Sequence, residues 1–157
     1  MFEKLADPKE VRLVEGAVPI RHRYTPGVAG EVFFSALKER GELVGSRCAS
    51  CGITYVPARL FCERCFEELS GDVTVGPQGT LESFTVGFVG LEGEALDEPV
   101  PLGLVRLDGA DTVLMHFLVD FDEEHALGIG DRVEIALKPE GERTGSILDI
   151  RGFKPVD

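Results

Sequence analysis

The sequence of 157 residues contains no tryptophan, no asparagine and a single glutamine. It also lacks a long apolar run. The longest candidate, Val113–Val119, is short and holds His116, whereas a membrane-spanning helix needs about 18 or more apolar residues. The first residues, Met-Phe-Glu-Lys-Leu-Ala-Asp-Pro, contain no apolar core of the kind found in secretory signals. These absences predict a soluble, cytoplasmic protein.

Basic residues are scarce. Lysine and arginine number 16 against 28 acidic residues, which gives a net charge of −12. The imbalance lies in one half of the chain, because residues 1–71 hold ten acids and ten bases, whereas residues 72–157 hold 18 acids and six bases. An acidic surface disfavours binding to nucleic acid and to anionic membranes. The change in composition near Gly71 predicts a boundary between modules there.

All four cysteines lie in two Cys-x-x-Cys pairs, Cys48 with Cys51 and Cys62 with Cys65. Two such turns supply four soft thiolate ligands in a tetrahedron, which suits zinc. The ten residues between the pairs fit a compact zinc ribbon, although many two-turn sites use a longer insert of about 15–20 residues. A site closed by four cysteines has no open coordination position, so the pattern predicts a structural ion.

Three other uses of these cysteines need weighing. Two disulfides are disfavoured in a cytoplasmic protein. A thioredoxin-like redox pair is disfavoured because no strand–helix–strand pattern surrounds either motif. Iron bound by the same four sulfurs, as in rubredoxin, is compatible with the sequence and stays open beside zinc.

The rest of the chain is predicted to be mainly β. Before the cysteines, residues 1–30 are predicted to be mostly irregular with a short helix near Pro8–Val14, and Glu31–Arg40 to be helical and to end at Gly41. After them, apolar β-rich runs predict five strands and therefore a five-stranded OB-fold barrel. We expect these strands over residues 79–89, 100–107, 112–119, 132–137 and 146–151.

This interpretation divides the chain into an N-terminal segment (1–41), a zinc ribbon (42–71) and an OB-fold domain (72–157). One predicted strand is apolar on both of its faces. One face carries Leu114 and Leu118, and the other carries Val113, Met115, Phe117 and Val119. A small barrel buries only one of these sets. The outer set is therefore expected to need a cover, either the N-terminal segment or another protein.

Three stretches resemble a known family, the zinc-ribbon plus OB-fold proteins once called domain of unknown function thirty-five. They are Phe33–Leu37, Gly45–Gly52 and Tyr55–Cys65, which correspond to the aromatic-rich helix, the first Cys-x-x-Cys-Gly and the Pro-Pro-Arg segment before the second Cys-x-x-Cys. The likeness continues through Gly79–Val86 and Leu127–Ile135, and covers roughly residues 22–152. The departure is Ala58, where the family usually has its second proline.

The resemblance implies an accessory subunit of a thiolase-fold acyl-CoA enzyme or of a 3-hydroxy-3-methylglutaryl-CoA synthase complex. Such a subunit would join a hetero-oligomer, bridge its subunits and help to bind or channel a CoA thioester shared with the partner enzyme. No catalytic residue is predicted in this chain. Thiolase chemistry needs a nucleophilic cysteine, and here the metal site claims all four, so the partner would supply it.

The phosphates of CoA require cations, and the bases lie mostly in the N-terminal half. Arg21, Arg23 and Arg59 are therefore the predicted contacts to CoA. An equally favoured alternative is that these arginines only pair with acids of the OB-fold half.

Two other functions remain as alternatives. OB folds and zinc ribbons also occur in modules that bind single-stranded nucleic acid, and these use basic grooves lined by aromatic residues. Four phenylalanines lie in or beside the first three barrel strands, namely Phe84, Phe88, Phe117 and Phe121. The acidity of this half nevertheless disfavours binding to nucleic acid. A stand-alone acyl-CoA-binding or rubredoxin-like redox protein is the third hypothesis.

Overall fold

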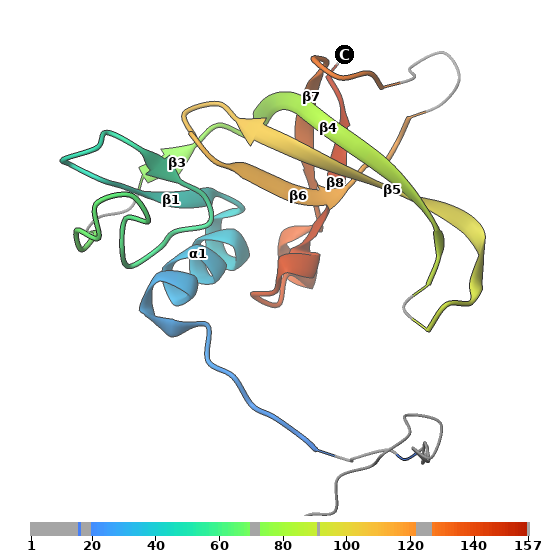
Figure 1. Cartoon of the computed structure of the whole chain (residues 1–157), viewed down its shortest axis with the longest axis horizontal. Coiled ribbons are helices and arrows are strands. Elements are labelled where there is room, and N and C mark those ends of the chain that lie inside the picture. The colour runs from blue at the N-terminus through green and yellow to red at the C-terminus, as the bar shows by residue number, and fades with distance from the viewer. Residues whose placement is uncertain (1–15, 17–19, 70–72, 91, 122–126, 157) are drawn as a thin grey trace, which may run out of the picture.

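The computed structural model describes residues 16, 20–69, 73–90, 92–121 and 127–156, and shows a helix, a small three-stranded sheet and a five-stranded barrel (Figure 1). The elements are α1 (Gly27–Arg40), β1 (Leu43–Arg47), β2 (Thr54–Tyr55), β3 (Val73–Val75), β4 (Gln78–Val89), β5 (Ala95–Leu107), β6 (Val113–Phe117), β7 (Arg132–Leu137), the 3₁₀ helices η2 (Glu140–Glu142) and η3 (Ile147–Asp149), and β8 (Ile150–Pro155). None of the described helices is long and apolar enough to cross a membrane. The short helix predicted near Pro8–Val14 lies outside the described residues.

The helix α1 starts four residues before the predicted position and ends where the sequence indicated. Gly41 adopts a left-handed conformation with φ 68°, and its N–H donates to the carbonyl of Leu37. This is the usual glycine stop of an α-helix. The helix buries Phe33 and Leu37 completely, so one face of α1 forms part of the protein core.

The strands β4 to β8 form the predicted barrel. Their order in the sheet is β6-β5-β4-β7-β8, with antiparallel neighbours. A parallel bridge between Leu118 and Phe153 closes the sheet, and the N–H of Val119 donates to the carbonyl of Phe153 at 2.9 Å. The predicted fold class is therefore confirmed: mainly β, with one N-terminal helix, a four-cysteine ribbon and a five-stranded OB-fold barrel.

The last predicted strand, over residues 146–151, is wrong in its position. The strand β8 begins only at Ile150, because Ser146 starts the short helix η3 instead. The Ser146 hydroxyl accepts the N–H of Leu148, and the carboxylate of Asp149 accepts the N–H of Ser146. This reciprocal capping turns the chain before the strand can begin.

The ribbon and the barrel share one apolar core. Phe33 from α1 and Val56 from the ribbon belong to the same buried cluster as Leu81 and Val133 from the barrel. The ribbon sheet has the order β2-β1-β3, so β3 pairs with the ribbon although it follows residue 71. The division of the chain at residue 71 stays a prediction.

Candidate functional site

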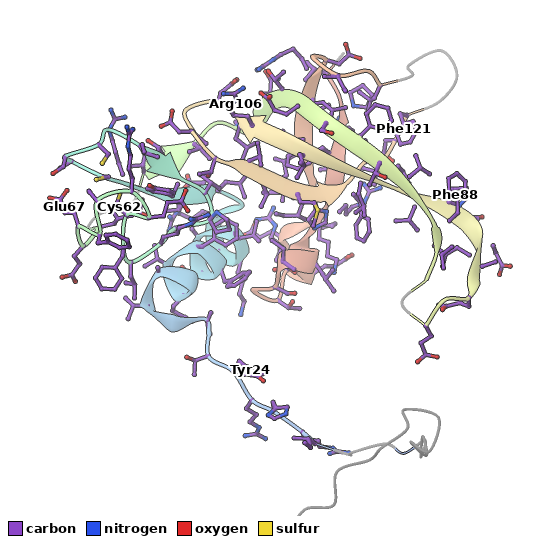
Figure 2. All side chains as sticks on the ribbon, in the orientation of Figure 1. Tyr24, Cys62, Glu67, Phe88, Arg106 and Phe121 are labelled. Atoms are coloured by element: carbon purple, nitrogen blue, oxygen red, sulfur yellow. The ribbon has the colours of Figure 1, made fainter. Side chains whose placement is uncertain are left out.

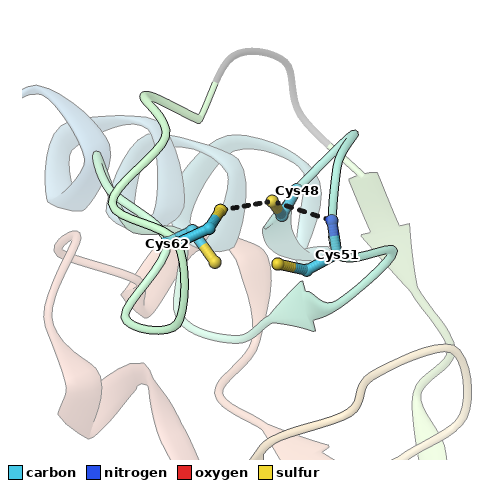
Figure 3. Close-up of side chains that lie close together, drawn as sticks. Cys48, Cys51 and Cys62 are labelled. Atoms are coloured by element: carbon cyan, nitrogen blue, oxygen red, sulfur yellow. Dashed lines mark hydrogen bonds between the residues drawn. The ribbon is translucent and has the colours of Figure 1, made fainter.

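The four cysteines converge at the outer end of the ribbon. Their sulfur atoms all lie within 4.8 Å of one another, and Figure 3 labels three of the four, Cys48, Cys51 and Cys62. The sulfurs of Cys48 and Cys65 are 3.5 Å apart. A tetrahedral zinc ion bound at about 2.3 Å from each sulfur needs spacings of this size. Cys48 and Cys62 are fully buried and Cys65 is exposed. The arrangement fits one tetrahedral metal ion.

The first cysteine turn follows β1. The N–H of Cys51 donates to the sulfur of Cys48 at 3.3 Å, and the N–H of Gly52 donates to the Cys48 carbonyl at 2.8 Å. Gly52 has φ 72°, a conformation that glycine adopts without steric cost. The local sequence Cys-x-x-Cys-Gly therefore folds into a turn that points an amide hydrogen at a metal-binding sulfur.

The second cysteine turn repeats this geometry without the glycine. The N–H of Phe66 donates to the Cys62 carbonyl at 2.9 Å, and the N–H of Cys62 donates to the carbonyl of Glu67. Phe66 stands where the first turn has Gly52, and it has φ 62°. Its side chain is 79% exposed, so the unfavourable backbone conformation is not offset by burial.

Replacing Phe66 with glycine is therefore expected to stabilise the protein by about 1 kcal/mol, since a left-handed conformation costs a side-chain-bearing residue about that much. Chemical denaturation of the metal-loaded protein measures the change. The matched control is Phe61→Gly, also on an exposed phenylalanine but without a positive φ. It should lower the stability by about 0.5–1 kcal/mol. Equal effects of the two changes would contradict this account.

A buried tyrosine supports the second turn. The hydroxyl of Tyr55 lies 3.2 Å from the sulfur of Cys62, and the side chain of Tyr55 is completely buried. This hydrogen bond lowers the pKa of Cys62 to about 6 and raises the pKa of Tyr55 to about 12. The thiolate is the form that binds a metal, so Tyr55 favours the liganding state of Cys62.

Glu67 ties the two cysteine turns together. Its carboxylate accepts the N–H of Ser50, in the first turn, at 3.2 Å. The hydrogen bonds from Ser50, followed by a contact with the Cys48 sulfur, hold the pKa of Glu67 below its usual value. The carboxylate therefore stays ionised and fixes one turn against the other.

The three arginines predicted to bind CoA lie in two separate places. Arg21 and Arg23 belong to the exposed segment that precedes α1. This segment, which also contains Tyr24, extends away from the body of the protein (Figure 2). Arg59 belongs to the ribbon, where its guanidinium lies over the Tyr55 ring at 5.0 Å and pairs with Glu63 at 2.5 Å. Arg59 thus pairs with an acid of the ribbon itself. A role of the three residues in CoA binding stays a prediction.

The outer apolar set of β6 is exposed, as the sequence indicated. Val113, Met115 and Phe117 all face outward, and Met115 is 62% exposed. Between them, His116 points inward and is buried. Its Nε2 lies 3.2 Å from the Ile147 carbonyl, and burial keeps the pKa of His116 below its usual value.

Comparison with known protein families agrees with this architecture. Residues 35–70 match a family model described as the rubredoxin-like zinc ribbon domain of ChsH2, and residues 72–138 match one described as the C-terminal OB-fold domain of ChsH2. A protein of Methanocaldococcus jannaschii described as a DUF35 domain-containing scaffold protein is 28% identical over 129 residues, which covers 77% of this chain and 86% of the relative. A scaffold protein of the same description from Methanothermobacter thermautotrophicus is 27% identical over 75% of this chain and 88% of its own length.

Two solved structures have the same fold. One is a protein of unknown function from the DUF35 family of Sulfolobus solfataricus, with a TM-score of 0.62 and 26% identity over 83% of this chain and 87% of that chain. The other is titled Ltp2-ChsH2(DUF35) aldolase, with a TM-score of 0.59 and 24% identity over 85% of this chain and 98% of that chain. At that identity, the second likeness shows the fold alone.

Proposed function

The chain belongs to the DUF35 family of zinc-ribbon plus OB-fold proteins, and from this we propose that it is a non-catalytic accessory subunit of a thiolase-type acyl-CoA enzyme complex. In this role it bridges subunits of a hetero-oligomer and helps to bind or channel the CoA thioester. Two observations on relatives support the proposal. The archaeal relatives are described as scaffold proteins, and a DUF35 chain of the same fold occurs in a structure titled as an aldolase of two components.

The observation that carries the proposal is the convergence of all four cysteine sulfurs within 4.8 Å. A thiolase needs a cysteine nucleophile and a base beside it, and cysteines that share one metal ion cannot act as nucleophiles. The described histidines do not supply a reactive pair either, because His22 is exposed before α1 and His116 is buried in the barrel. The partner enzyme therefore provides the chemistry.

We propose that the ion is zinc, with Cys48, Cys51, Cys62 and Cys65 as ligands. Four thiolates fill the tetrahedron, so the ion has no open position for a substrate. Its role is to hold the ribbon together. Among the described residues, the small buried cluster around the sulfurs contains Tyr55 and Leu69 besides Cys48 and Cys62, with Ile53 partly buried against it. This is too little apolar material to fold a ribbon by itself.

Arg21, Arg23 and Arg59 are the proposed contacts of this chain to the CoA phosphates, with further cations from the partner. Arg21 and Arg23 precede α1 in an exposed segment that extends from the body (Figure 2). A segment of this kind can lie along a partner's surface and add its charges to a shared site. The OB-fold half repels anions, since it carries the net charge of −12.

The test is co-expression of the full chain with thiolase-fold enzymes from the same source organism, followed by size-exclusion chromatography and titration with CoA. A stable complex is expected. Reversing charge with Arg21→Glu and Arg23→Glu is expected to weaken CoA binding to the complex by about tenfold or more, since each removes a phosphate contact. The control is Arg151→Glu in the OB-fold half, which should leave CoA affinity unchanged. Failure of the unaltered chain to bind any thiolase-fold enzyme would contradict the proposed function.

The alternative of a single-stranded nucleic-acid module is not favoured by the exposed phenylalanines of the barrel. Phe88 is exposed on β4, but the hairpin that carries it contains four acids and no base. Aromatic platforms for nucleic acid lie in basic grooves. A salt-sensitive shift of single-stranded DNA at low ionic strength would revive this alternative.

A further inference from the structure

The strands β4 and β5 continue well past their neighbours in the barrel. β4 pairs with β7 only over Gln78–Thr80, and β5 pairs with β6 only over Leu102–Arg106. One residue further along, Leu81 exchanges hydrogen bonds with Gly130 and Asp131, and the N–H of Leu118 donates to the carbonyl of Pro101. Beyond these contacts the described parts of the two strands pair only with each other. They form a hairpin, residues 86–100, that projects from the barrel and that we call the arm (Figure 1). The strands expected over residues 79–89 and 100–107 leave residues 90–99 between them, but β5 already begins at Ala95, which pairs with Val89.

The arm exposes large apolar side chains. Phe88 is 63% exposed and Val89 is 60% exposed, and Val86 and the neighbouring Phe84 at the base are also exposed (Figure 2). Phe84 and Val86 alternate along β4, so they point to one face of the hairpin. Phe88 and Val89 follow at the register shift between Gly87 and Val89. A two-stranded hairpin is only marginally stable alone in water, and exposed apolar clusters commonly mark interaction sites. A surface of this kind gains stability when a partner covers it.

The charge of the arm is of one sign. Residues 86–100 contain four acids, Glu92, Glu94, Asp97 and Glu98, and no lysine, arginine or histidine. The described acids are all exposed, and they lie at and near the tip of the hairpin, next to the apolar side chains. The arm therefore combines an apolar strip with an acidic rim.

We propose that the arm is a docking element for a partner protein whose surface offers an apolar groove rimmed by lysine and arginine. This inference rests on the proposed function, because the partner is the thiolase-fold subunit of that complex. Charge complementarity selects this occupant. A second copy of the chain would bring two sets of four acids together, and an anionic membrane or a nucleic acid would repel the same rim.

The matched control lies outside the arm. Ile129 is 68% exposed and Phe88 is 63% exposed, and Ile129 lies in the turn that precedes β7. A change at Ile129 therefore removes a similarly exposed apolar side chain without touching the arm. Met115 on the outer face of β6 is unsuitable as the control, because its apolar set is itself expected to need a cover.

The experiment measures the affinity of the full chain for the thiolase-fold enzyme that co-purifies with it, by isothermal titration calorimetry. The double change Phe88→Ser with Val89→Ser is expected to raise the Kd by at least about tenfold, as for apolar side chains at the centre of an interface. Ile129→Ser should leave the Kd within about twofold. Because these side chains are exposed, the thermal midpoints of all variants should match that of the unaltered chain, which excludes unfolding as the cause.

The acidic rim is tested separately. Reversing charge with Asp97→Lys and Glu98→Lys is expected to slow association at low salt by about tenfold or more, and the difference should shrink at high salt. The control Glu140→Lys with Glu142→Lys reverses two exposed acids outside the arm. It should have a smaller effect on the association rate.

The results separate the two proposals. If the unaltered chain binds the enzyme and the arm variants bind equally well, the docking proposal is overturned and the proposed function stands. If the unaltered chain binds no thiolase-fold enzyme, both fall together. Analytical ultracentrifugation gives a further test. If the unaltered chain is a dimer and the double variant Phe88→Ser with Val89→Ser is a monomer, the occupant of the arm is a second copy of the chain, and the proposal is overturned.

Discussion

Chelation of the zinc proposed at the four cysteines is expected to unfold the ribbon and to lower the thermal midpoint of the whole protein by more than about 15 °C. The ribbon has no core of its own beyond a few residues around the sulfurs. Without the ion, the buried Cys48 and Cys62 would lose their shared partner, and the two cysteine turns would be held by weaker contacts such as the hydrogen bond from Ser50 to Glu67. Differential scanning calorimetry before and after chelation measures the change.

The loss should extend from the ribbon into the barrel, because the two are joined by more than their shared core. The N–H of Thr54 donates to the carboxylate of Asp111 at 2.8 Å, and the N–H of Val56 donates to the hydroxyl of Thr112 at 2.9 Å. Both acceptors lie in the turn between β5 and β6. Unfolding of the ribbon therefore removes hydrogen-bond partners from the barrel and exposes Val56, which packs in the common core.

Two controls establish which metal ion is bound and whether the loss of thermal stability is reversible. Metal analysis should find one zinc per chain, and addition of zinc but not magnesium should restore the original midpoint, since thiolates select soft ions. Visible absorbance from the purified protein would indicate iron in the same four sulfurs. A chelated, metal-free protein that melts at the original temperature would show that the ion does not stabilise the fold.

The parts of the fold that the sequence predicted correctly depend on local patterns. The spacing of the two Cys-x-x-Cys motifs indicated the metal centre, and the four sulfurs do converge. Gly41 marked the end of α1, and the predicted strand over residues 132–137 is β7. In each case neighbouring residues determine the conformation, through a left-handed glycine or an uninterrupted β-rich run.

The features that the sequence did not reveal depend on contacts between distant segments. In the sequence Tyr55 only begins the stretch that leads to the second cysteine pair, and nothing in its neighbours indicates that its hydroxyl lies beside Cys62. The predicted second strand starts only at residue 100, because the acids and Pro99 obscure the first part of β5, which reaches past the stretch paired with β6. Asp149 was counted among the residues of a strand, although its carboxylate holds a turn that prevents the strand from beginning there.

Asp149→Asn is expected to destabilise the protein by about 3 kcal/mol and to lower the thermal midpoint by about 9 °C. The carboxylate is completely buried and accepts the N–H groups of Thr144, Gly145 and Ser146 at distances between 2.6 and 3.1 Å. An asparagine has one acceptor oxygen and a donating amide, so at least one of these N–H groups would face another donor. Urea denaturation at pH 7 measures the loss. Glu140→Gln, at an exposed acid of η2, is the control and should change the stability by less than about 0.5 kcal/mol.

The pH dependence distinguishes this role from simple packing. Burial alone would raise the pKa of Asp149, but the N–H groups of Thr144, Ser146 and Gly145 outweigh it and hold the pKa below its usual value. A lowered folded-state pKa means that the stabilisation is complete above the ordinary aspartate pKa of about 3.9 and is lost as the pH falls through the folded-state value. The stability difference between the unaltered protein and Asp149→Asn should therefore be constant from pH 7 to about pH 5 and should shrink below about pH 4. A difference that stays constant in acid would mean that the volume and shape of the side chain, and not its charge, hold the turn before β8.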